Sequence, residues 1–295
     1  EHDLPKRVIE PLIRTLQRLG GRHIAHRAIR PDNIYFLDAE KQDLVLGECA
    51  SCPPGFDQPV VFETIECAMS SPGGRGIGHY SEDLYAFGVT LVLLLLGRNP
   101  VSGLSDEELI TAKIESGTYA TLCGNERIPV SLLEPLRGVL TDDPAERWGL
   151  DEMEKWLSGQ RATPMQRKAA PKSEIPFSFG GKEHFTARTL GWAFSLDVSE
   201  AARVIRERQV EQWVRRGLKN AELADDLATA LLTAKNHENN WRGSDDLLVT
   251  HVSIILDPDG PVRYKDFAFM PEGFGPAFAV EILRRGNVQI PAEVI

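Results

Sequence analysis

The chain has 295 residues, a formal net charge of −10 and 42% hydrophobic residues, which suffices for one large or two medium domains with buried cores. Its acidic balance argues against non-specific nucleic-acid binding, because such binding needs a basic face that displaces counterions from phosphates. We therefore expect no nucleic-acid partner.

The sequence contains no segment that we expect to enter a membrane. Its longest apolar run, Val89 to Leu96 interrupted only by Thr90, is far shorter than the roughly 20 residues that cross a bilayer. This run predicts a buried helix and no membrane insertion. The chain begins at Glu1 and has no signal-peptide pattern, so we expect a fragment of a longer cytoplasmic protein.

Four cysteines, Cys49, Cys52, Cys67 and Cys123, are too few for a disulfide framework in a chain of this length. Cys49 and Cys52 form a C-x-x-C pair, which raises the possibility of zinc. Structural zinc usually needs a second close pair, and the other two cysteines are isolated. We expect no metal site and favour small buried hydrophobic side chains.

The first elements along the chain are a helix and a small β-hairpin. The helix ends at Gly20-Gly21. Two short apolar runs, 33–37 and 43–46, are separated by a polar turn and predict the hairpin. The apolar positions of the helix are Val8, Ile9, Leu12, Ile13, Leu16 and Leu19.

Between helix and hairpin lies the segment His26-Arg27-Ala28-Ile29-Arg30-Pro31-Asp32-Asn33. It resembles the catalytic loop of protein kinases, which runs His-Arg-Asp, four residues, then Asn. The resemblance places Ala28 where the family has the Asp that accepts the proton of the substrate hydroxyl. A methyl group cannot accept a proton, and Asp32, four residues further on, is not expected to replace the missing base.

Three later segments extend this resemblance over roughly residues 4–157. Glu48 stands where the family has the metal-binding Asp of its Asp-Phe-Gly motif, and Asp83 opens a segment similar to the central buried helix. Asp142-Asp143-Pro144-Ala145-Glu146-Arg147 resembles the Asp-Pro-x-x-Arg segment near the end of the C-terminal lobe. The resemblance implies a mainly α protein-kinase-like C-terminal lobe with small β-hairpins.

The resemblance also implies roles for particular residues. Asn33 and Glu48 would be remnants of the nucleotide and metal site, and Asp83 would brace the catalytic loop through hydrogen bonds. Arg27 either receives an activation-loop phosphate or, as we favour, pins the loop through a buried ion pair or hydrogen bond. His26 and Arg147 are likewise interpreted as structural, with no catalytic residue left in the loop.

Several family features are not found in the sequence. No Ala-Pro-Glu motif is evident, so Arg147 needs another partner or faces solvent. The glycine-rich phosphate loop and the nucleotide-binding Lys of the N-terminal lobe are also absent, so we expect no cofactor and no ATP or Mg²⁺ binding by this fragment. The glycines of residues 73–78 follow no strand and are interpreted as a surface turn.

The remaining chain is predicted to form a linker and a second, mainly helical domain. Residues 158–176 lose apolar periodicity, contain three prolines and are basic, which is typical of a solvated linker. Helical patterns then recur over 177–295, and Ser244 followed by Asp245-Asp246 predicts one helix start. No enzyme motif is evident there, and the role of this domain stays open.

The sequence supports two functional hypotheses and does not decide between them. The leading hypothesis is a pseudokinase, not an enzyme, that acts as a scaffold or regulatory module for an unknown protein partner. The alternative is an unconventional ATP- and Mg²⁺-dependent phosphotransferase whose N-terminal lobe lies upstream. A weaker variant of the first hypothesis makes the helical domain the functional part and the kinase-like lobe its platform.

Overall fold

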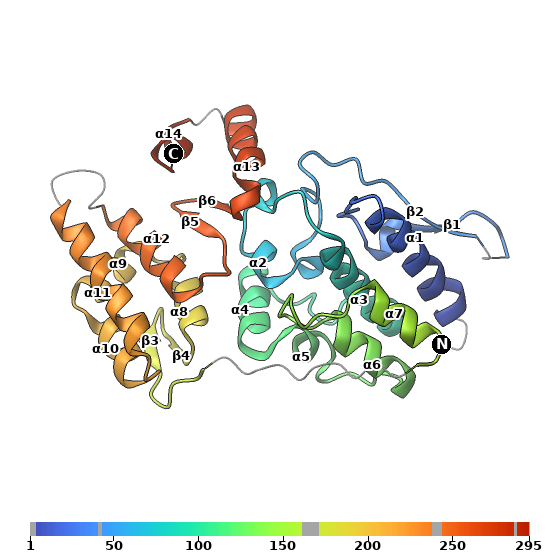
Figure 1. Ribbon diagram of the computed structural model, residues 1–295, viewed down its shortest axis with the longest axis horizontal. Coiled ribbons are helices and arrows are strands. Elements are labelled where there is room, and N and C mark those ends of the chain that lie inside the picture. Colours follow the sequence, from blue (N-terminus) through green and yellow to red (C-terminus); the bar gives the residue numbers. More distant parts are fainter. Residues whose placement is uncertain (1–3, 41–42, 161–170, 238–243, 286–287, 295) are drawn as a thin grey trace. The chain divides into compact units, whose positions relative to one another are not determined.

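The computed structural model describes residues 4–40, 43–160, 171–237, 244–285 and 288–294 (Figure 1). The chain divides into two compact units. Unit 1 comprises Glu1–Ala68 and Arg75–Arg167, and unit 2 comprises Met69–Gly74 and Lys168–Ile295. Within the described ranges, no helix combines the length and the apolar character that crossing a membrane would require.

Unit 1 begins with the predicted helix and hairpin. The helix consists of the π-helical turn η1 (Pro5–Ile9) and α1 (Glu10–Gly20), and it buries Ile9, Leu12 and Leu16. The 3-10 turn η2 (Pro31–Asn33) leads into β1 (Ile34–Phe36), which pairs antiparallel with β2 (Leu44–Leu46). Both predictions are confirmed.

The core of unit 1 surrounds α3 (Tyr80–Leu96), the element predicted from the long apolar run. Leu84, Tyr85 and Val89 are fully buried, as expected for a helix that is apolar on all sides. The further elements of unit 1 are η3 (Val60–Phe62), α2 (Ile65–Ala68), α4 (Asp106–Ser116), α5 (Thr118–Cys123), α6 (Val130–Val139) and α7 (Leu150–Leu157).

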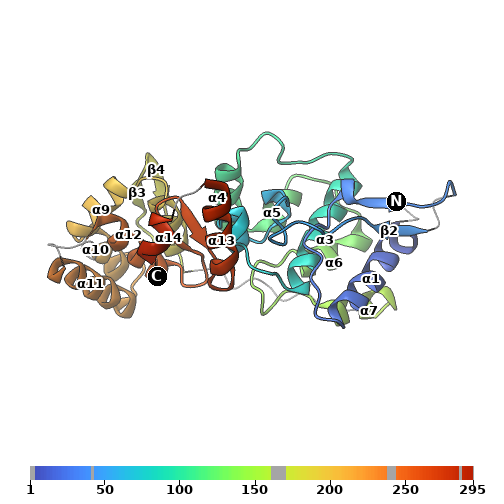
Figure 2. The ribbon, with the colours of Figure 1, turned by 90° about the horizontal axis from the view of Figure 1, so that it is seen from above.

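Within the residues that the structure describes, unit 2 has its own core, formed by five helices and one hairpin. Leu190, Phe194, Val214 and Val252 are fully buried in it. Figure 2 shows the neighbouring helices α9, α10 and α11 with the β3–β4 hairpin. These elements are β3 (Phe177–Phe179), β4 (Lys182–His184), α8 (Ala187–Phe194), α9 (Val198–Arg206), α10 (Gln209–Arg216), α11 (Ala221–Asn236) and α12 (Asp245–Leu256).

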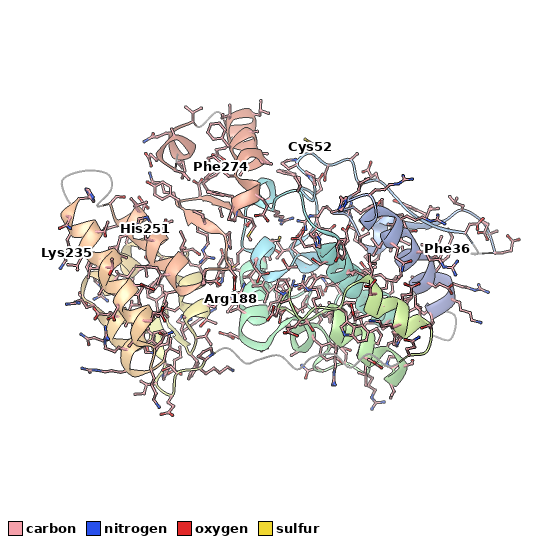
Figure 3. All side chains as sticks on the ribbon, viewed as in Figure 1. Phe36, Cys52, Arg188, Lys235, His251 and Phe274 are labelled. Carbon is pink, nitrogen blue, oxygen red and sulfur yellow. The ribbon has the colours of Figure 1, made fainter. Side chains whose placement is uncertain are left out.

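The predicted start of α12 is confirmed, because the Ser244 side chain accepts a hydrogen bond from the amide of Leu247. The chain then forms a second hairpin and a smaller aromatic cluster, which includes Phe274 (Figure 3). These elements are η4 (Pro72–Gly74), β5 (Val262–Tyr264), β6 (Phe267–Phe269), η6 (Pro271–Gly273), α13 (Phe274–Val280), η7 (Glu281–Arg285) and α14 (Gln289–Val294).

The mainly helical fold class, with small antiparallel strand pairs, is confirmed. The hairpins of unit 2 were not foreseen, because strands of three residues give almost no periodic signal. Gly180 and Gly181, both with positive φ, are the turn signal that could have indicated the first of them.

The structure divides the chain differently from the predicted boundaries at 157 and 176. Residues 161–170 of the predicted linker lie outside the described residues. Residues after them already pack in unit 2, because the amide of Ser173 donates to the carbonyl of Phe185 and the indole of Trp213 donates to the carbonyl of Ile175. Backbone pairing of this kind leaves no periodic pattern in the sequence.

Candidate functional site

The catalytic-type loop of unit 1 is fixed to α3 by Asp83. Its carboxylate accepts hydrogen bonds from the backbone amides of His26 (2.6 Å) and Arg27 (2.8 Å). Asp83 is almost fully buried, and burial raises its pKa to about 6 against the two amide hydrogen bonds, which lower it. Asp83 therefore holds the loop through the backbone amides of His26 and Arg27, which is the role that the resemblance implies for it.

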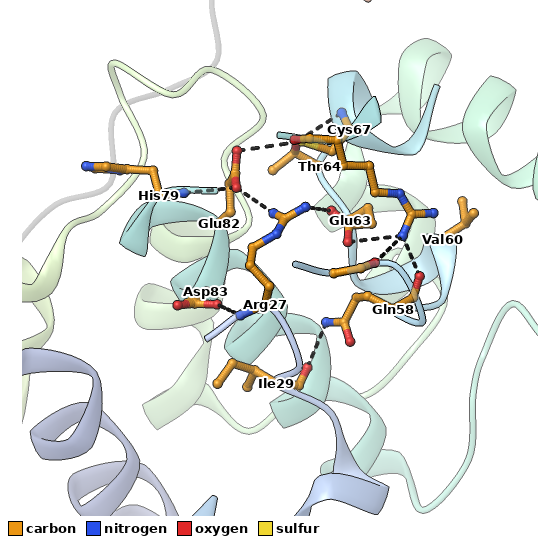
Figure 4. Close-up of polar contacts among 12 residues, drawn as sticks. Arg27, Ile29, Gln58, Val60, Glu63, Thr64, Cys67, His79, Glu82 and Asp83 are labelled. Carbon is orange, nitrogen blue, oxygen red and sulfur yellow. Dashed lines mark hydrogen bonds and ion pairs between the residues drawn. The ribbon is translucent and has the colours of Figure 1, made fainter. Parts of the chain in front are cut away.

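Arg27 lies in a buried network of ion pairs (Figure 4). Its guanidinium donates to Glu63 at 3.0 Å and to Glu82 at 2.5 Å, and its side chain is only 3% exposed. Burial lowers the pKa of Arg27, but the carboxylates of Glu63 and Glu82 raise it by more, so the group stays protonated. This is the arrangement expected if Arg27 pins the loop through buried ion pairs.

Arg75 also pairs with Glu63, and sequence reasoning did not single it out. Its guanidinium donates to the carbonyls of Gly55 (3.0 Å) and Gln58 (2.7 Å) and to Glu63 at 3.4 Å. The carboxylate of Glu63 thus lies between two buried guanidinium groups. Nothing in the sequence marks Glu63 or Arg75, because their importance depends on which distant residues they meet.

The backbone of Arg27 has a φ of 57°, a left-handed conformation that costs a non-glycine residue energy. Glycine makes room for its side chain on one side. Gly78 has a φ of +82°, and a Cβ there would overlap the methylenes of Arg27. Gly78 therefore has a packing role as well as a conformational one. The expected surface turn at 73–78 is wrong in this respect, because Gly73, Gly74 and Gly76 are buried.

Asn33 is buried and holds together the two sides of the candidate site. Its amide nitrogen donates to the carbonyls of Ala28 (2.9 Å) and Glu48 (2.8 Å). A Cβ at Gly47 would overlap the Asn33 amide oxygen, so glycine is required for this approach. Because the nitrogen is already used, the Asn33 oxygen is the atom left for a cation.

His26 is buried and its Nε2 lies 3.3 Å from the carbonyl of Gly47. Burial lowers its pKa below the ordinary value. The ring therefore spans from the catalytic-type loop to the segment that carries Glu48, as a packed side chain would.

Ala28 borders a small cavity of about 130 Å³ on unit 1. Glu48, Asp57 and Arg30 line the same cavity. Asp57 is exposed and was not foreseen as a site residue. Asp32 does not line this cavity and pairs with Arg30 at 3.0 Å. The place of the absent carboxylate is therefore bordered by two other acids.

Arg147 is buried although no Ala-Pro-Glu motif was found for it. Its guanidinium donates to the carbonyls of Thr141 (2.8 Å) and Asp142 (3.0 Å) and lies over the ring of Tyr85. The sequence left two possibilities for Arg147, another partner or solvent. In the structure it contacts these other partners.

The donor atoms for a metal ion are few. Cys49 and Cys52 are both exposed, free thiols (Figure 3 labels Cys52), and the residues that the structure describes contain no cluster of three His, Cys, Asp or Glu ligands. Mg²⁺ in phosphoryl-transfer sites is held by one or two carboxylates and the substrate phosphates. Glu48 and the amide oxygen of Asn33 fit that requirement as oxygen donors.

The sequence is similar to protein kinases of several organisms. It is 27% identical over 182 residues to an SNF-related serine/threonine-protein kinase of Rattus norvegicus, covering 59% of this chain and 23% of that protein. It is 26% identical over 165 residues to a calcium and calcium/calmodulin-dependent serine/threonine-protein kinase of Pisum sativum, covering 52% and 31%. No protein-family model matches the chain.

A third relative extends over more of the chain. Calcium-dependent protein kinase 3 of Plasmodium berghei (strain Anka) is 22% identical over 280 residues, covering 88% of this chain and 47% of that protein. The chain thus spans less than half the length of each of these three relatives. These three relatives are all protein kinases, and the mainly helical fold is consistent with a kinase-like C-terminal lobe.

The comparisons contradict one prediction, that the chain is not an enzyme. The relatives are named as serine/threonine kinases, which points to enzyme activity. The prediction rested on Ala28, on Glu48 and on the absence of an Ala-Pro-Glu motif and of N-terminal-lobe elements from the sequence. A motif shows which carboxylate is missing from a loop, but it does not show which carboxylates from elsewhere border the same cavity.

Proposed function

We propose that this chain supplies the catalytic-loop half of an ATP- and Mg²⁺-dependent phosphotransferase that acts on serine or threonine hydroxyls of proteins. Its nucleotide-binding lobe would belong to the longer protein. The observation that carries the proposal is the loop itself, clamped by Asp83 and joined by Asn33 to the Glu48 segment. The named activities of the distant relatives support it.

In this proposal, most residues of the site position the loop and do not take part in the chemical step. Phosphoryl transfer depends mainly on positioning and on electrostatic stabilisation. Asp83 and Arg27 fix the loop backbone, and Asn33 fixes the spacing between Ala28 and Glu48. Bound Mg²⁺ would neutralise charge on the phosphates, with Glu48 and Asn33 as its protein ligands.

We assign to Asp57 the role of general base, which accepts the proton of the substrate hydroxyl. Asp57 lines the same cavity as Ala28, and we propose that a substrate hydroxyl placed there transfers its proton to the Asp57 carboxylate. The hydroxyl oxygen would then bond to the γ-phosphorus of ATP while the bond to the leaving ADP oxygen breaks. The carboxylate therefore replaces the base that the loop lacks.

The decisive experiment uses the longest natural chain with radiolabelled ATP, Mg²⁺ and protein substrates. Asp57→Asn should lower kcat about 10²-fold or more, the usual contribution of a general base, without raising KM for ATP. Nucleotide binding, measured as the rise in Tm with MgATP, should stay unchanged in Asp57→Asn and fall in Glu48→Gln.

Asp32→Asn is the matched control, because Asp32 is an exposed carboxylate on the same loop that does not line the cavity. It should leave kcat nearly unchanged. Absence of phosphate transfer by the wild-type chain would refute the proposed function, whereas full activity of Asp57→Asn would refute only the role of Asp57.

A regulatory protein-interaction role is the second candidate, and the β1–β2 hairpin favours it. Phe36 (Figure 3) and its neighbours Tyr35 and Leu37 are exposed apolar side chains on one short segment. Exposed apolar clusters of this kind are typical of interaction surfaces. Leu37→Asp should abolish capture of a protein partner by the full chain, and Val130→Asp, at another exposed apolar site of unit 1, should not.

We propose a cytoplasmic location of the protein for either function. It is supported by the four cysteines, all of which are free.

A further inference from the structure

Residues Met69–Gly74 belong to unit 2, although the chain before and after them belongs to unit 1. The segment pairs with β6 and the residue after it. The amide of Ser71 donates to the carbonyl of Ala268 (3.0 Å), and the amide of Met270 donates to the carbonyl of Gly74 (2.8 Å). Unit 2 therefore holds this piece of chain through backbone hydrogen bonds at Ser71 and Gly74, the two ends of the turn that contains η4.

The segment is also closely packed. Gly73 and Gly74 are buried, and a Cβ on Gly74 would overlap the carbonyl oxygen of Ala268 and the backbone of Phe269. A Cβ on Gly73 would lie 3.0 Å from Val280 of α13. Gly74 therefore leaves no room for a side chain against β6, and Gly73 lies in close contact with the Val280 side chain.

A buried cation contacts the first residue of the segment. The guanidinium of Arg263 on β5 donates to the sulfur of Met69 (3.3 Å) and to the carbonyl of Gly191 (3.2 Å), and it lies over the ring of Trp192. Burial lowers the pKa of Arg263 to about 10. β5, β6 and α13 thus contact the segment along its length.

The residue that follows the segment belongs to the network around Arg27. Arg75 is the next residue after Gly74 and donates to Glu63 and to the carbonyls of Gly55 and Gln58. Any displacement of Gly74 displaces the Arg75 backbone through one peptide bond. Glu63, held by Arg75, in turn pairs with Arg27 of the catalytic-type loop.

We propose that unit 2 is a binding module for residues 69–74 and that, by holding them, it orders residues 55–63 and the Arg27 network of unit 1. The β5–β6 hairpin with α13 is the binding surface, and the Ser-Pro-Gly-Gly segment of the same chain is its occupant. This assigns a function to unit 2, for which the sequence offers none, and it does not depend on phosphotransfer.

Hydrogen exchange on the full chain tests the proposal. Gly74→Ala introduces the overlap with Ala268, whereas Gly275→Ala makes the same change on α13 where nothing lies within 4 Å. Gly74→Ala should accelerate exchange about tenfold or more over residues 69–74 and also over 55–63, because local opening is easier once the segment is displaced. Gly275→Ala should change neither region, and α6 in unit 1 should exchange normally in both variants.

A second variant keeps the test decisive if Gly74→Ala does not fold. Ser71→Pro removes the amide that donates to the carbonyl of Ala268 and the hydroxyl that accepts from the Ala268 amide, on a half-buried residue next to Pro72. It should produce the same pattern, with faster exchange over both 69–74 and 55–63. If either folded variant accelerates residues 69–74 but leaves 55–63 unchanged, unit 2 holds the segment without ordering the network, and the proposal is wrong.

Discussion

At the scale of single residues, the candidate site depends on buried charged side chains. Glu63 is nearly inaccessible and accepts from both Arg27 and Arg75. A buried ion pair contributes little net stability, but removal of one partner leaves the others buried without compensation. The network therefore makes the position of the catalytic-type loop sensitive to any one of its members.

Replacing Glu63 measures this sensitivity. Glu63→Gln should lower the free energy of unfolding by about 3–5 kcal/mol, because two guanidinium groups lose their shared carboxylate. Glu10→Gln is the control, since Glu10 pairs with Arg14 on the exposed face of α1 and should cost less than about 0.5 kcal/mol. Denaturant titration of both variants gives the two values, and a Glu63→Gln cost as small as the control would contradict the expectation.

The raised pKa of Asp83 predicts a dependence of stability on pH. Since the folded pKa of about 6 exceeds the ordinary value of 3.8, the folded state binds more protons than the unfolded state between these values. The contribution of Asp83 is therefore fully present below about pH 4 and is lost as the pH rises through about 6.

Asp83→Asn isolates this contribution. The variant lacks the titration, so the free energy of unfolding of the wild type minus that of the variant should fall between pH 4 and 6, by on the order of 3 kcal/mol. The variant should also lose roughly 1–3 kcal/mol throughout, because an amide nitrogen would face the backbone amides of the loop. A difference that does not vary with pH would show that the Asp83 pKa is not raised.

At the scale of elements, α4 is tied to η3 by one lysine. Lys113 is fully buried, and its ammonium donates to the carbonyls of Val60 (3.3 Å), Val61 (3.0 Å) and Glu63 (2.9 Å). Burial lowers its pKa from 10.5 to about 8. Through Lys113, α4 therefore contacts residues 60–63, the same segment that Arg27 and Arg75 contact through the Glu63 carboxylate.

Lys113→Met should destabilise the chain by about 1–3 kcal/mol at pH 7, because buried carbonyls lose a donor. As the folded pKa of the lysine is lowered, the unfolded state binds more protons between pH 8 and 10.5, and wild-type stability should rise over that range relative to the variant. Lys155→Met, on the exposed face of α7, should show neither effect in parallel pH-dependent unfolding. A wild-type advantage that shrinks above pH 8 would refute the lowered pKa.

At the scale of the whole molecule, the two units have separate cores. Leu136 is fully buried in the core of unit 1 and Leu190 in that of unit 2. Leu136→Ala and Leu190→Ala should each cost about 2–5 kcal/mol. In calorimetry, each variant should lower the transition of its own unit, because the lost contacts belong to one core. Equal shifts of a single common transition would show that the chain unfolds as one cooperative body.

How much the sequence predicts also depends on scale. The spacing from His26 to Asn33 placed a loop before a hairpin, and the apolar run at 89–96 placed a buried helix, because both patterns are local. Glu63, Arg75 and Asp57 gave no such signal. Each is an ordinary polar residue in sequence and becomes notable only beside Arg27 or Ala28.

The sequence by itself determined the kinase-like order of elements in unit 1, because helical and strand periods and turn residues act over a few neighbouring positions. Only the tertiary structure decided what surrounds Ala28 and what holds Arg27, since Arg27 pairs with Glu63 and Glu82, which lie 36 and 55 positions away. It also decided that residues 69–74 pack with β6, almost 200 positions away. Pairings over such distances depend on the path of the whole chain, and no local pattern records them.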